Sequence, residues 1–269
     1  MIWLLCLLAG AAAVGAAVWL PLHRPFLRGN RAPYSLRHVR QNPASPLRGK
    51  RIFFLGSSVT QGMTSRGQSF VDVLERADGC RVIKAAVLAS TLADRGPHSY
   101  LKRLRRHPAA SQPMDCFVCQ LSTNDATFRS RLGTVSDSFD PAAFDTRTAA
   151  GGMEAIIAYA RETWHCPVVF LTGTRYDNPR YHKLVNLCLD IAEKWQADVI
   201  DLWHDSTMNA VDPADYRLYM ADGVHPTRAG YLLWWTPAIR RRLCRILAGP
   251  AAEGLPHLPG AGAAADSRM

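Results

Sequence analysis

Acidic side chains are scarce in this sequence, and the shortage is greatest near its beginning. The 269 residues carry 22 Asp and Glu against 32 Lys and Arg, which gives a formal net charge of +10. Between Arg24 and Arg51 there are seven Arg, one Lys and no acidic residue. Such a basic stretch suits nucleic acid or an anionic lipid surface. The sequence contains no recognisable nucleic-acid-binding module, so we expect no nucleic-acid partner and favour lipid headgroups.

Charged side chains are absent altogether from residues 2–22. About 20 apolar residues of helix cross the hydrocarbon core of a bilayer, so the length predicts a single-pass N-terminal membrane anchor over residues 1–22. A cleaved signal peptide is the alternative, but signal peptides begin with a positively charged stretch that this segment lacks. The positive-inside rule places the following domain in the cytoplasm. Basic residues upstream of the given start would reverse that orientation, so the side of the membrane stays open.

A disulfide framework and a zinc motif are also lacking. The seven cysteines are odd in number and scattered through apolar stretches, which is not the pattern of paired cysteines. Cys116 and Cys119 form a C-x-x-C within a predicted strand, where residues three apart point to opposite faces. No second C-x-x-C completes a zinc site. We therefore expect small buried core residues at these positions and no bound metal.

The chain has no internal repeat, and from residue 50 onward it alternates short apolar runs with amphipathic ones. The predicted strands are Arg51–Leu55, Arg81–Ala86, Cys116–Leu121, Pro167–Leu171 and Asp198–Leu202. The predicted helices are Ser69–Ala77, Met153–Trp164, Tyr181–Trp195 and Thr227–Leu247, the last with Thr227 as its N-cap. This alternation predicts an α/β domain built on a parallel sheet with both faces covered.

The composition divides the chain into four parts. After the predicted anchor, residues 23–49 are rich in Arg, Pro and Asn and are predicted to be a basic juxtamembrane linker. Residues 50–247 form the domain, and residues 248–269, which are mostly Ala, Gly and Pro, are predicted to be a disordered tail. Within the domain we expect the basic run Lys102–Arg106 to be a solvent-exposed face. The irregular stretch 126–149 is long for a connector and is a candidate for shaping a pocket.

Polar side chains stand where the predicted strands end. Ser58 follows the first strand, Asn124 follows the third, and Asp222 and His225 lie directly before the last helix. Because parallel sheets place ligands at the carboxyl ends of their strands, these side chains are expected to converge. A serine hydroxyl becomes a nucleophile when an imidazole takes its proton, and a carboxylate orients that imidazole. The set therefore predicts acyl transfer.

The segments that hold these residues resemble the blocks of the SGNH/GDSL hydrolase superfamily. Gly56-Ser57-Ser58 is similar to the G-D-S turn, Ser122-Thr123-Asn124-Asp125 to the G-x-N-D block, and Asp222-Gly223-Val224-His225 to the terminal D-x-x-H. They come in the family's order, and the resemblance covers essentially residues 50–247. It implies a three-layer α/β/α flavodoxin-like sandwich with a five-stranded parallel sheet.

The resemblance also implies an activity, that of a serine esterase without metal or organic cofactor. Carried over by motif, Ser58 is the nucleophile, His225 the base and Asp222 its orienting acid. The oxyanion hole would comprise the N–H groups of Ser58 and Ala89 and the Asn124 amide. Three positions depart from the family pattern: Ser57 replaces Asp, Ser122 replaces Gly, and Ala89 replaces a Gly whose N–H completes the oxyanion hole. The added methyl of Ala89 puts the local backbone conformation in question.

The resemblance leaves the substrate and the acceptor open. Family substrates include small acyl groups on carbohydrate and lipid esters, so the expected partner is a small-molecule or glycan ester. One alternative is a glycan O-acyltransferase that uses the same site. A second alternative is a non-catalytic membrane-tethered binding protein, for which Ser58→Ala would leave ligand binding unchanged.

Overall fold

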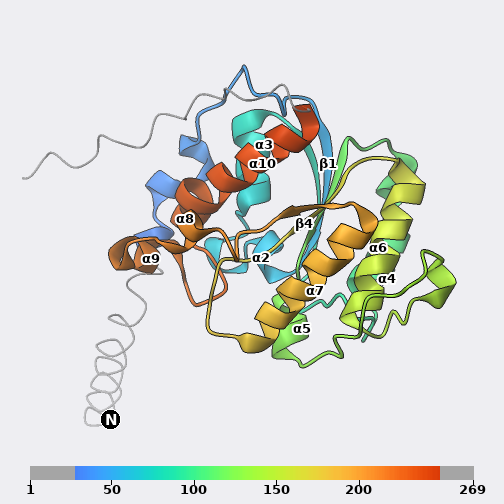
Figure 1. The fold of residues 1–269 in the computed structure, drawn as a ribbon. Coiled ribbons are helices and arrows are strands. Elements are labelled where there is room, and N and C mark those ends of the chain that lie inside the picture. Colours follow the sequence, from blue (N-terminus) through green and yellow to red (C-terminus); the bar gives the residue numbers. More distant parts are fainter. Residues whose placement is uncertain (1–27, 249–269) are drawn as a thin grey trace, which may run out of the picture.

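The computed structural model describes residues 28–248, and Figure 1 shows them folded around one central sheet. Five strands lie in the order β2-β1-β3-β4-β5, and every neighbouring pair is parallel. The strands are β1 Arg51–Gly56, β2 Arg81–Ala86, β3 Cys116–Gln120, β4 Val168–Leu171 and β5 Asp198–Ile200. The predicted α/β class, with a five-stranded parallel sheet, is confirmed.

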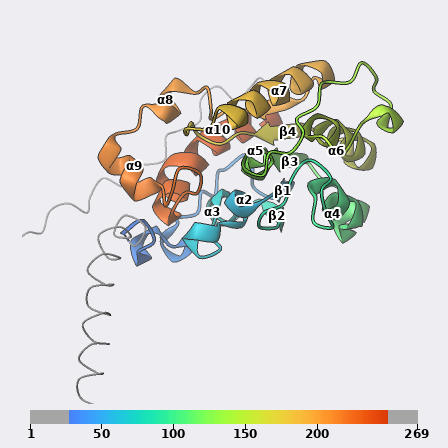
Figure 2. The same cartoon turned by 90° about the horizontal axis from the view of Figure 1, so that it is seen from below.

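Helices cover both faces of the sheet, which makes three layers (Figures 1 and 2). One face carries α4 Tyr100–Arg106, α6 Ala149–Trp164 and α7 Pro179–Trp195, and the other carries α3 Phe70–Asp78, α8 Ser206–Asn209 and α10 Thr236–Ala248. Shorter elements occupy the loops: α2 Ser58–Gln61, α5 Thr123–Thr127, α9 Pro213–Tyr219, and the 3-10 turns Ala32–Tyr34, Leu36–His38, Met63–Ser65, Pro108–Ser111 and Pro141–Ala143. Because helices cover both faces of the sheet, side chains on both sides of each strand are buried. This explains why the strands appear in the sequence as apolar runs.

Side chains of each strand alternate between the two layers of the core. Phe53 and Leu55 of β1 pack toward α4 and α6, whereas Ile52 and Phe54 pack toward α3 and α10. Cys116 and Cys119 of β3 follow the same rule and lie in opposite layers, as their spacing predicts. Both are free thiols, so this C-x-x-C forms no disulfide.

The last predicted helix is interrupted at its start. Thr227 caps it, because the Thr227 hydroxyl accepts a hydrogen bond from the N–H of Gly230 at 3.2 Å. The segment Gly230–Trp235 is then a π-helix, and α10 continues from Thr236. At its end, the indole N–H of Trp235 and the Thr236 hydroxyl are buried and have no hydrogen-bond partner within residues 28–248, which costs free energy.

Residues 28–49, the described part of the predicted linker, pack against the domain. Leu47 is fully buried in the core layer of α3 and α10, and Val39 packs on Val73 and Ala77. The N–H of Asn42 donates to the carbonyl of Ala77 at 2.7 Å. Val39 and Leu47 are isolated apolar residues in a stretch without periodicity, so the sequence predicts neither a strand nor a helix there. Each nevertheless packs into the core.

The predicted anchor over residues 1–22 and the predicted tail from residue 249 onward lie outside the described residues. Between residues 28 and 248, no helix combines the length and the apolar character needed to span a membrane.

Candidate active site

The turn after β1 presents Ser58 at the edge where the strands end. Gly56 closes the strand, and a Cβ atom at this position would lie 1.9 Å from the Thr60 hydroxyl, so only glycine fits. Ser57 is the N-cap residue of α2, and Ser58 is the first residue of that helix. The sharp turn leaves Ser58 only 5% exposed, with its side chain directed to the loop of Asp222 and His225.

Ser58, His225 and Asp222 form one hydrogen-bonded chain, although 167 residues separate the first two. Ser58 Oγ lies 2.8 Å from His225 Nε2. The other ring nitrogen, Nδ1, lies 2.8 Å from Asp222 Oδ2 and 3.0 Å from Oδ1. The structure therefore brings together the three residues that the motif spacing predicts, in the order hydroxyl, imidazole, carboxylate.

The Asp222 carboxylate is held by its own loop. Oδ1 accepts hydrogen bonds from the backbone N–H of Val224 at 2.7 Å and of His225 at 2.8 Å. Partial burial acts to raise the pKa of Asp222, but the His225 side chain and these backbone donors outweigh burial and lower the pKa below its ordinary value. The carboxyl is thus ionised at neutral pH, as required to orient an imidazole and stabilise its protonated form.

Three N–H donors in the segments that follow β1, β2 and β3 are candidates for an oxyanion hole. Within residues 28–248, the backbone N–H groups of Ser58 and Ala89 have no hydrogen-bond acceptor. The Asn124 side-chain nitrogen donates to the Ser90 carbonyl at 2.9 Å. An amide nitrogen carries two hydrogens, so one remains for a ligand.

The loop that carries Ala89 is tied to the Asn124 segment. The Ser90 carbonyl accepts hydrogen bonds from both the Asn124 amide and the Ser122 hydroxyl, the latter at 3.0 Å. The Ser122 hydroxyl also accepts from the N–H of Asn124 at 3.2 Å, which caps α5. Serine in place of the family's glycine therefore adds a link between two of the predicted oxyanion donors.

Ala89 occupies the backbone region that usually takes glycine. Its φ is +56°, the left-handed conformation, which costs about 1–2 kcal/mol for a residue with a Cβ. The residue is exposed, so its methyl group meets solvent rather than the core. The alanine is therefore held in a conformation that glycine adopts without strain, at the cost of local strain here.

Gln120, the last residue of β3, organises the nucleophile turn and is a residue that sequence reasoning missed. Its side-chain oxygen accepts from the Ser57 N–H and hydroxyl, both at 3.2 Å, and from the Thr60 hydroxyl at 3.3 Å. The buried Tyr100 hydroxyl lies 3.4 Å from the same oxygen. Ser57, which replaces the family's Asp, is therefore fixed from the strand side. A polar residue at the end of an apolar strand is the sequence signal that could have revealed Gln120.

Arg103 is a second missed residue, and here the expectation of a solvent-exposed basic face is wrong. Its guanidinium donates to the carbonyls of Ala85 and Gly56, both at 2.8 Å, and to the Ser90 hydroxyl at 3.2 Å. Burial lowers the pKa of Arg103. The side chain thus joins the ends of β1 and β2 to the residue after Ala89. Nothing in the basic run 102–106 distinguishes this arginine from its neighbours.

Asp125 also binds the loop that carries Ala89. Its carboxylate accepts from the N–H groups of Leu92 at 2.7 Å and Ala93 at 3.1 Å. Burial raises the pKa of Asp125, and those hydrogen bonds oppose the increase. The Asp of the predicted G-x-N-D-like block therefore has a structural contact with the loop rather than a contact with Ser58 or His225.

A second Asp-x-x-His pair shows that the spacing alone does not make a site. Asp201 and His204, after β5, have the same separation in sequence, and His204 Nδ1 lies 2.7 Å from Asp201 Oδ2. Within the described residues no serine, threonine or cysteine side chain hydrogen-bonds to His204. Its ring instead lies beside His182, with centroids 5.7 Å apart. This pair lacks the hydroxyl that accompanies His225.

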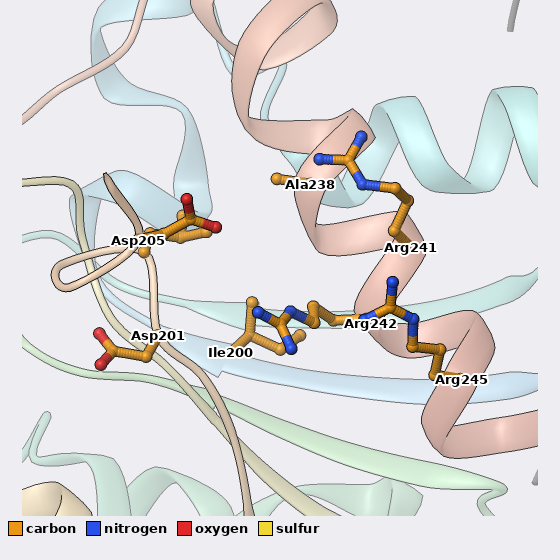
Figure 3. A pocket seen from close by; sticks show the side chains of 8 residues that line it. Ile200, Asp201, Asp205, Ala238, Arg241, Arg242 and Arg245 are labelled. Carbon is orange, nitrogen blue, oxygen red and sulfur yellow. The ribbon is translucent and has the colours of Figure 1, made fainter. Parts of the chain in front are cut away.

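Asp201 also lines a hollow between β5 and α10, shown in Figure 3. Arg241, Arg242 and Arg245 project from α10 around it, and Asp201 and Asp205 lie across from them. None of Ser58, His225, Ala89 or Asn124 lines this hollow. It is therefore separate from the candidate active site.

Most of the long stretch 126–149 leads away from that site. Phe139 packs edge-on against Trp195, with centroids 4.9 Å apart. Trp195 is the last residue of α7, close to where β5 begins, at the edge opposite the strand ends. The two ends of the stretch lie together, because the N–H of Ala149 donates to the carbonyl of Arg131 at 2.9 Å. The hypothesis that it shapes the pocket is therefore confined to these two ends.

The model of the GDSL-like lipase/acylhydrolase family matches residues 54–233. The chain belongs to this family. GDSL-family membership makes it an ester-hydrolysing enzyme, as the motifs predicted. The match contains Ser58, Ala89, Asn124, Asp222 and His225.

Solved structures show that the fold is shared. A Lactobacillus plantarum protein is 20% identical, with a TM-score of 0.59 over 75% of this chain and 97% of that one. The inhibitor-bound M. smegmatis aryl esterase is 17% identical, with a TM-score of 0.51 over 74% of this chain and 100% of that one. No curated protein matches the chain.

Proposed function

We propose that this GDSL-family enzyme is a serine esterase that works through an acyl-enzyme on Ser58. The observation that carries the proposal is the unbroken hydrogen-bonded chain from Ser58 Oγ through His225 to Asp222. In the acylation step, Ser58 Oγ attacks the ester carbonyl carbon while His225 Nε2 takes the hydroxyl proton. The protonated ring then gives that proton to the leaving alkoxide, and the acyl group stays on Ser58.

Deacylation reverses the roles of nucleophile and leaving group. Water attacks the acyl carbonyl and gives its proton to His225 Nε2, and Ser58 Oγ takes the proton as the carboxylic acid departs. In both steps negative charge develops on the former carbonyl oxygen. The N–H groups of Ser58 and Ala89 and the free hydrogen of the Asn124 amide are the donors available to it. Losing one such donor typically costs about 10²–10³-fold in turnover.

The proposed substrates are esters of small acyl groups on carbohydrate, or lipid esters. An N-terminal anchor over residues 1–22, which we also propose, would hold the enzyme where either is presented. A glycan O-acyltransferase would use the same residues with a sugar hydroxyl in place of water. Adding a glycan acceptor to the assay separates the two, because a transferase forms acylated glycan faster than free acid.

The proposed function is tested by ester turnover in the full chain, held in mild detergent. Wild type should hydrolyse short-chain p-nitrophenyl esters, and Ser58→Ala and His225→Ala should each lower kcat by about 10³-fold or more. His204→Ala is the matched control, since it removes the imidazole of the second Asp-x-x-His pair, and it should retain wild-type turnover. If Ser58→Ala turns over esters at the wild-type rate, the proposed mechanism is wrong.

A further inference from the structure

Large exposed apolar side chains are few in the described residues, and most of them gather at one edge of the sheet. Met63, Leu88, Phe128 and Phe139 are between 45% and 57% exposed. The first three lie in the segments that follow β1, β2 and β3. Single exposed apolar residues need no explanation, but three around one site point to a partner. We call Met63, Leu88 and Phe128 the apolar rim.

The apolar rim borders the proposed catalytic residues. Leu88 directly precedes Ala89, Phe128 follows Asn124 by four positions, and Met63 follows Ser58 by five. The strands before these segments are neighbours in the order β2-β1-β3. Because adjacent strands lie about 4.8 Å apart, the outer two strand ends are only about 10 Å apart. The edge-on view of Figure 2 shows α2 and α5 side by side at this edge.

Hydrogen bonds fix the backbone beneath each rim residue. Next to Met63, the Thr64 hydroxyl donates to the carbonyl of Pro226 at 2.9 Å. Next to Leu88, the N–H of Val87 donates to the Gly56 carbonyl at 3.3 Å. The Phe128 carbonyl accepts from the Arg95 guanidinium at 2.8 Å. The side chains therefore project into solvent from anchored segments.

Cations accompany the apolar rim. Arg66, Arg95 and Arg129 are exposed, and none of them forms an ion pair within residues 28–248. The segments 62–66, 86–90 and 126–131 contain no acidic residue. Apolar tips among unpaired cations match the surface of an anionic bilayer, where the tips enter the headgroup region and the cations meet phosphates.

The beginning of the described chain lies beside the same edge. The Asn30 side chain donates to the carbonyl of Thr64 at 2.8 Å and accepts from the N–H of Arg228 at 3.1 Å. Thr64 is next to Met63, and Arg228 is three residues after His225. Only residues 23–27 separate Arg28 from the uncharged apolar run 2–22, and five residues span at most about 18 Å. An apolar run in a bilayer would therefore keep this edge close to the lipid.

We propose that the apolar rim docks on an anionic lipid surface, so that Ser58 faces the bilayer and receives its ester from it. The hydrolytic part of this inference rests on the proposed function, but the docking itself does not. Docking brings the site to lipid-borne esters without requiring them to cross water. It also favours lipid esters over soluble glycan esters as the substrate class.

Hydrogen exchange measured by mass spectrometry tests the docking without reference to activity. The full chain is compared without vesicles and with vesicles of equal parts phosphatidylglycerol and phosphatidylcholine. Exchange should slow in peptides covering residues 62–66, 86–90 and 126–131 and stay unchanged around Phe139. The slowing should be lost in the triple variant Met63→Ser, Leu88→Ser, Phe128→Ser. Unchanged exchange at the rim, or slowing confined to the arginines of α10 around the hollow of Figure 3, would overturn the proposal.

A kinetic ratio provides the second test. The rate on a fatty-acyl ester held in the same vesicles is divided by the rate on soluble p-nitrophenyl acetate. The triple variant should lower this ratio by about tenfold or more. Phe139→Ser, the matched control, should leave it unchanged. An unaltered ratio in an active triple variant contradicts the docking, whereas absence of all turnover in wild type contradicts the proposed function and leaves the exchange result to decide the docking.

Discussion

At the scale of single residues, Ala89 combines a strained backbone with a proposed role as an oxyanion donor. Its φ is positive, and within residues 28–248 its N–H has no hydrogen-bond acceptor. Glycine would adopt this conformation without strain. The resulting gain in folded-state stability is partly offset, because glycine has greater conformational freedom in the unfolded chain. Proline can neither adopt a positive φ nor donate a hydrogen bond.

The pair Ala89→Gly and Ala89→Pro therefore separates the role of the backbone from that of the methyl group. The glycine variant should keep kcat within about threefold of wild type and change the free energy of unfolding by less than about 1 kcal/mol. The proline variant should lower kcat by about 10²-fold or more, as expected for a lost oxyanion donor. Steady-state kinetics and denaturant unfolding measure both. A proline variant with wild-type kcat would remove Ala89 from the oxyanion hole.

The residues most open to prediction from sequence were those with short-range patterns. Ser58 after a strand and the Asp222–His225 spacing follow from motifs, and the structure joins them. The contacts of Gln120 and Arg103 could not be foreseen, because each depends on pairing strands and loops distant in sequence. The sequence of a basic run does not show which of its arginines has three hydrogen-bond acceptors around its guanidinium.

At the scale of elements, the site depends on three strand ends held in register. Arg103 joins Gly56 at the end of β1 to Ala85 in β2 and to Ser90 beside Ala89. A planar guanidinium can serve three acceptors in fixed directions, and an ammonium group cannot reproduce that geometry. We therefore assign Arg103 a positioning role for the oxyanion loop.

Arg103→Lys should lower kcat by about tenfold or more while changing KM little, because misplaced donors weaken the transition state more than the bound ester. Arg105→Lys, an exposed arginine of the same helix, is the matched control and should behave as wild type. The measurement is steady-state kinetics on a soluble p-nitrophenyl ester, with circular dichroism to show that both variants are folded. Equal kcat in the two variants would count against the positioning role.

Elements with a clear period were predicted closely: β2 has the predicted bounds, and α7 begins two residues before its predicted start. The helices α4, α8 and α9 were not predicted, because each is seven residues or shorter and carries too few turns for a periodic pattern. The π-helix Gly230–Trp235 was also missed. It packs against α3 and α9, and no local sequence signal marks it.

At the scale of the whole molecule, the parallel sheet accounts for the site. The segment after β1 and the loop before the last helix, 167 residues apart at Ser58 and His225, meet at the edge where the strands end. The apolar rim, the unpaired arginines and the first described residues share that edge. Fold class and family could be read from the sequence, whereas the packing of residues 28–49 onto the domain could not.

The central claim is that Ser58 forms the acyl-enzyme, and covalent labelling tests it most directly. The full chain is treated with a fluorophosphonate, and the modified peptide is identified by mass spectrometry. We predict one adduct, on Ser58, that is lost in Ser58→Ala and retained in Ser57→Ala, whose hydroxyl hydrogen-bonds Gln120 instead of His225. Labelling of a different residue, or folded wild-type protein that remains unlabelled, would contradict the account.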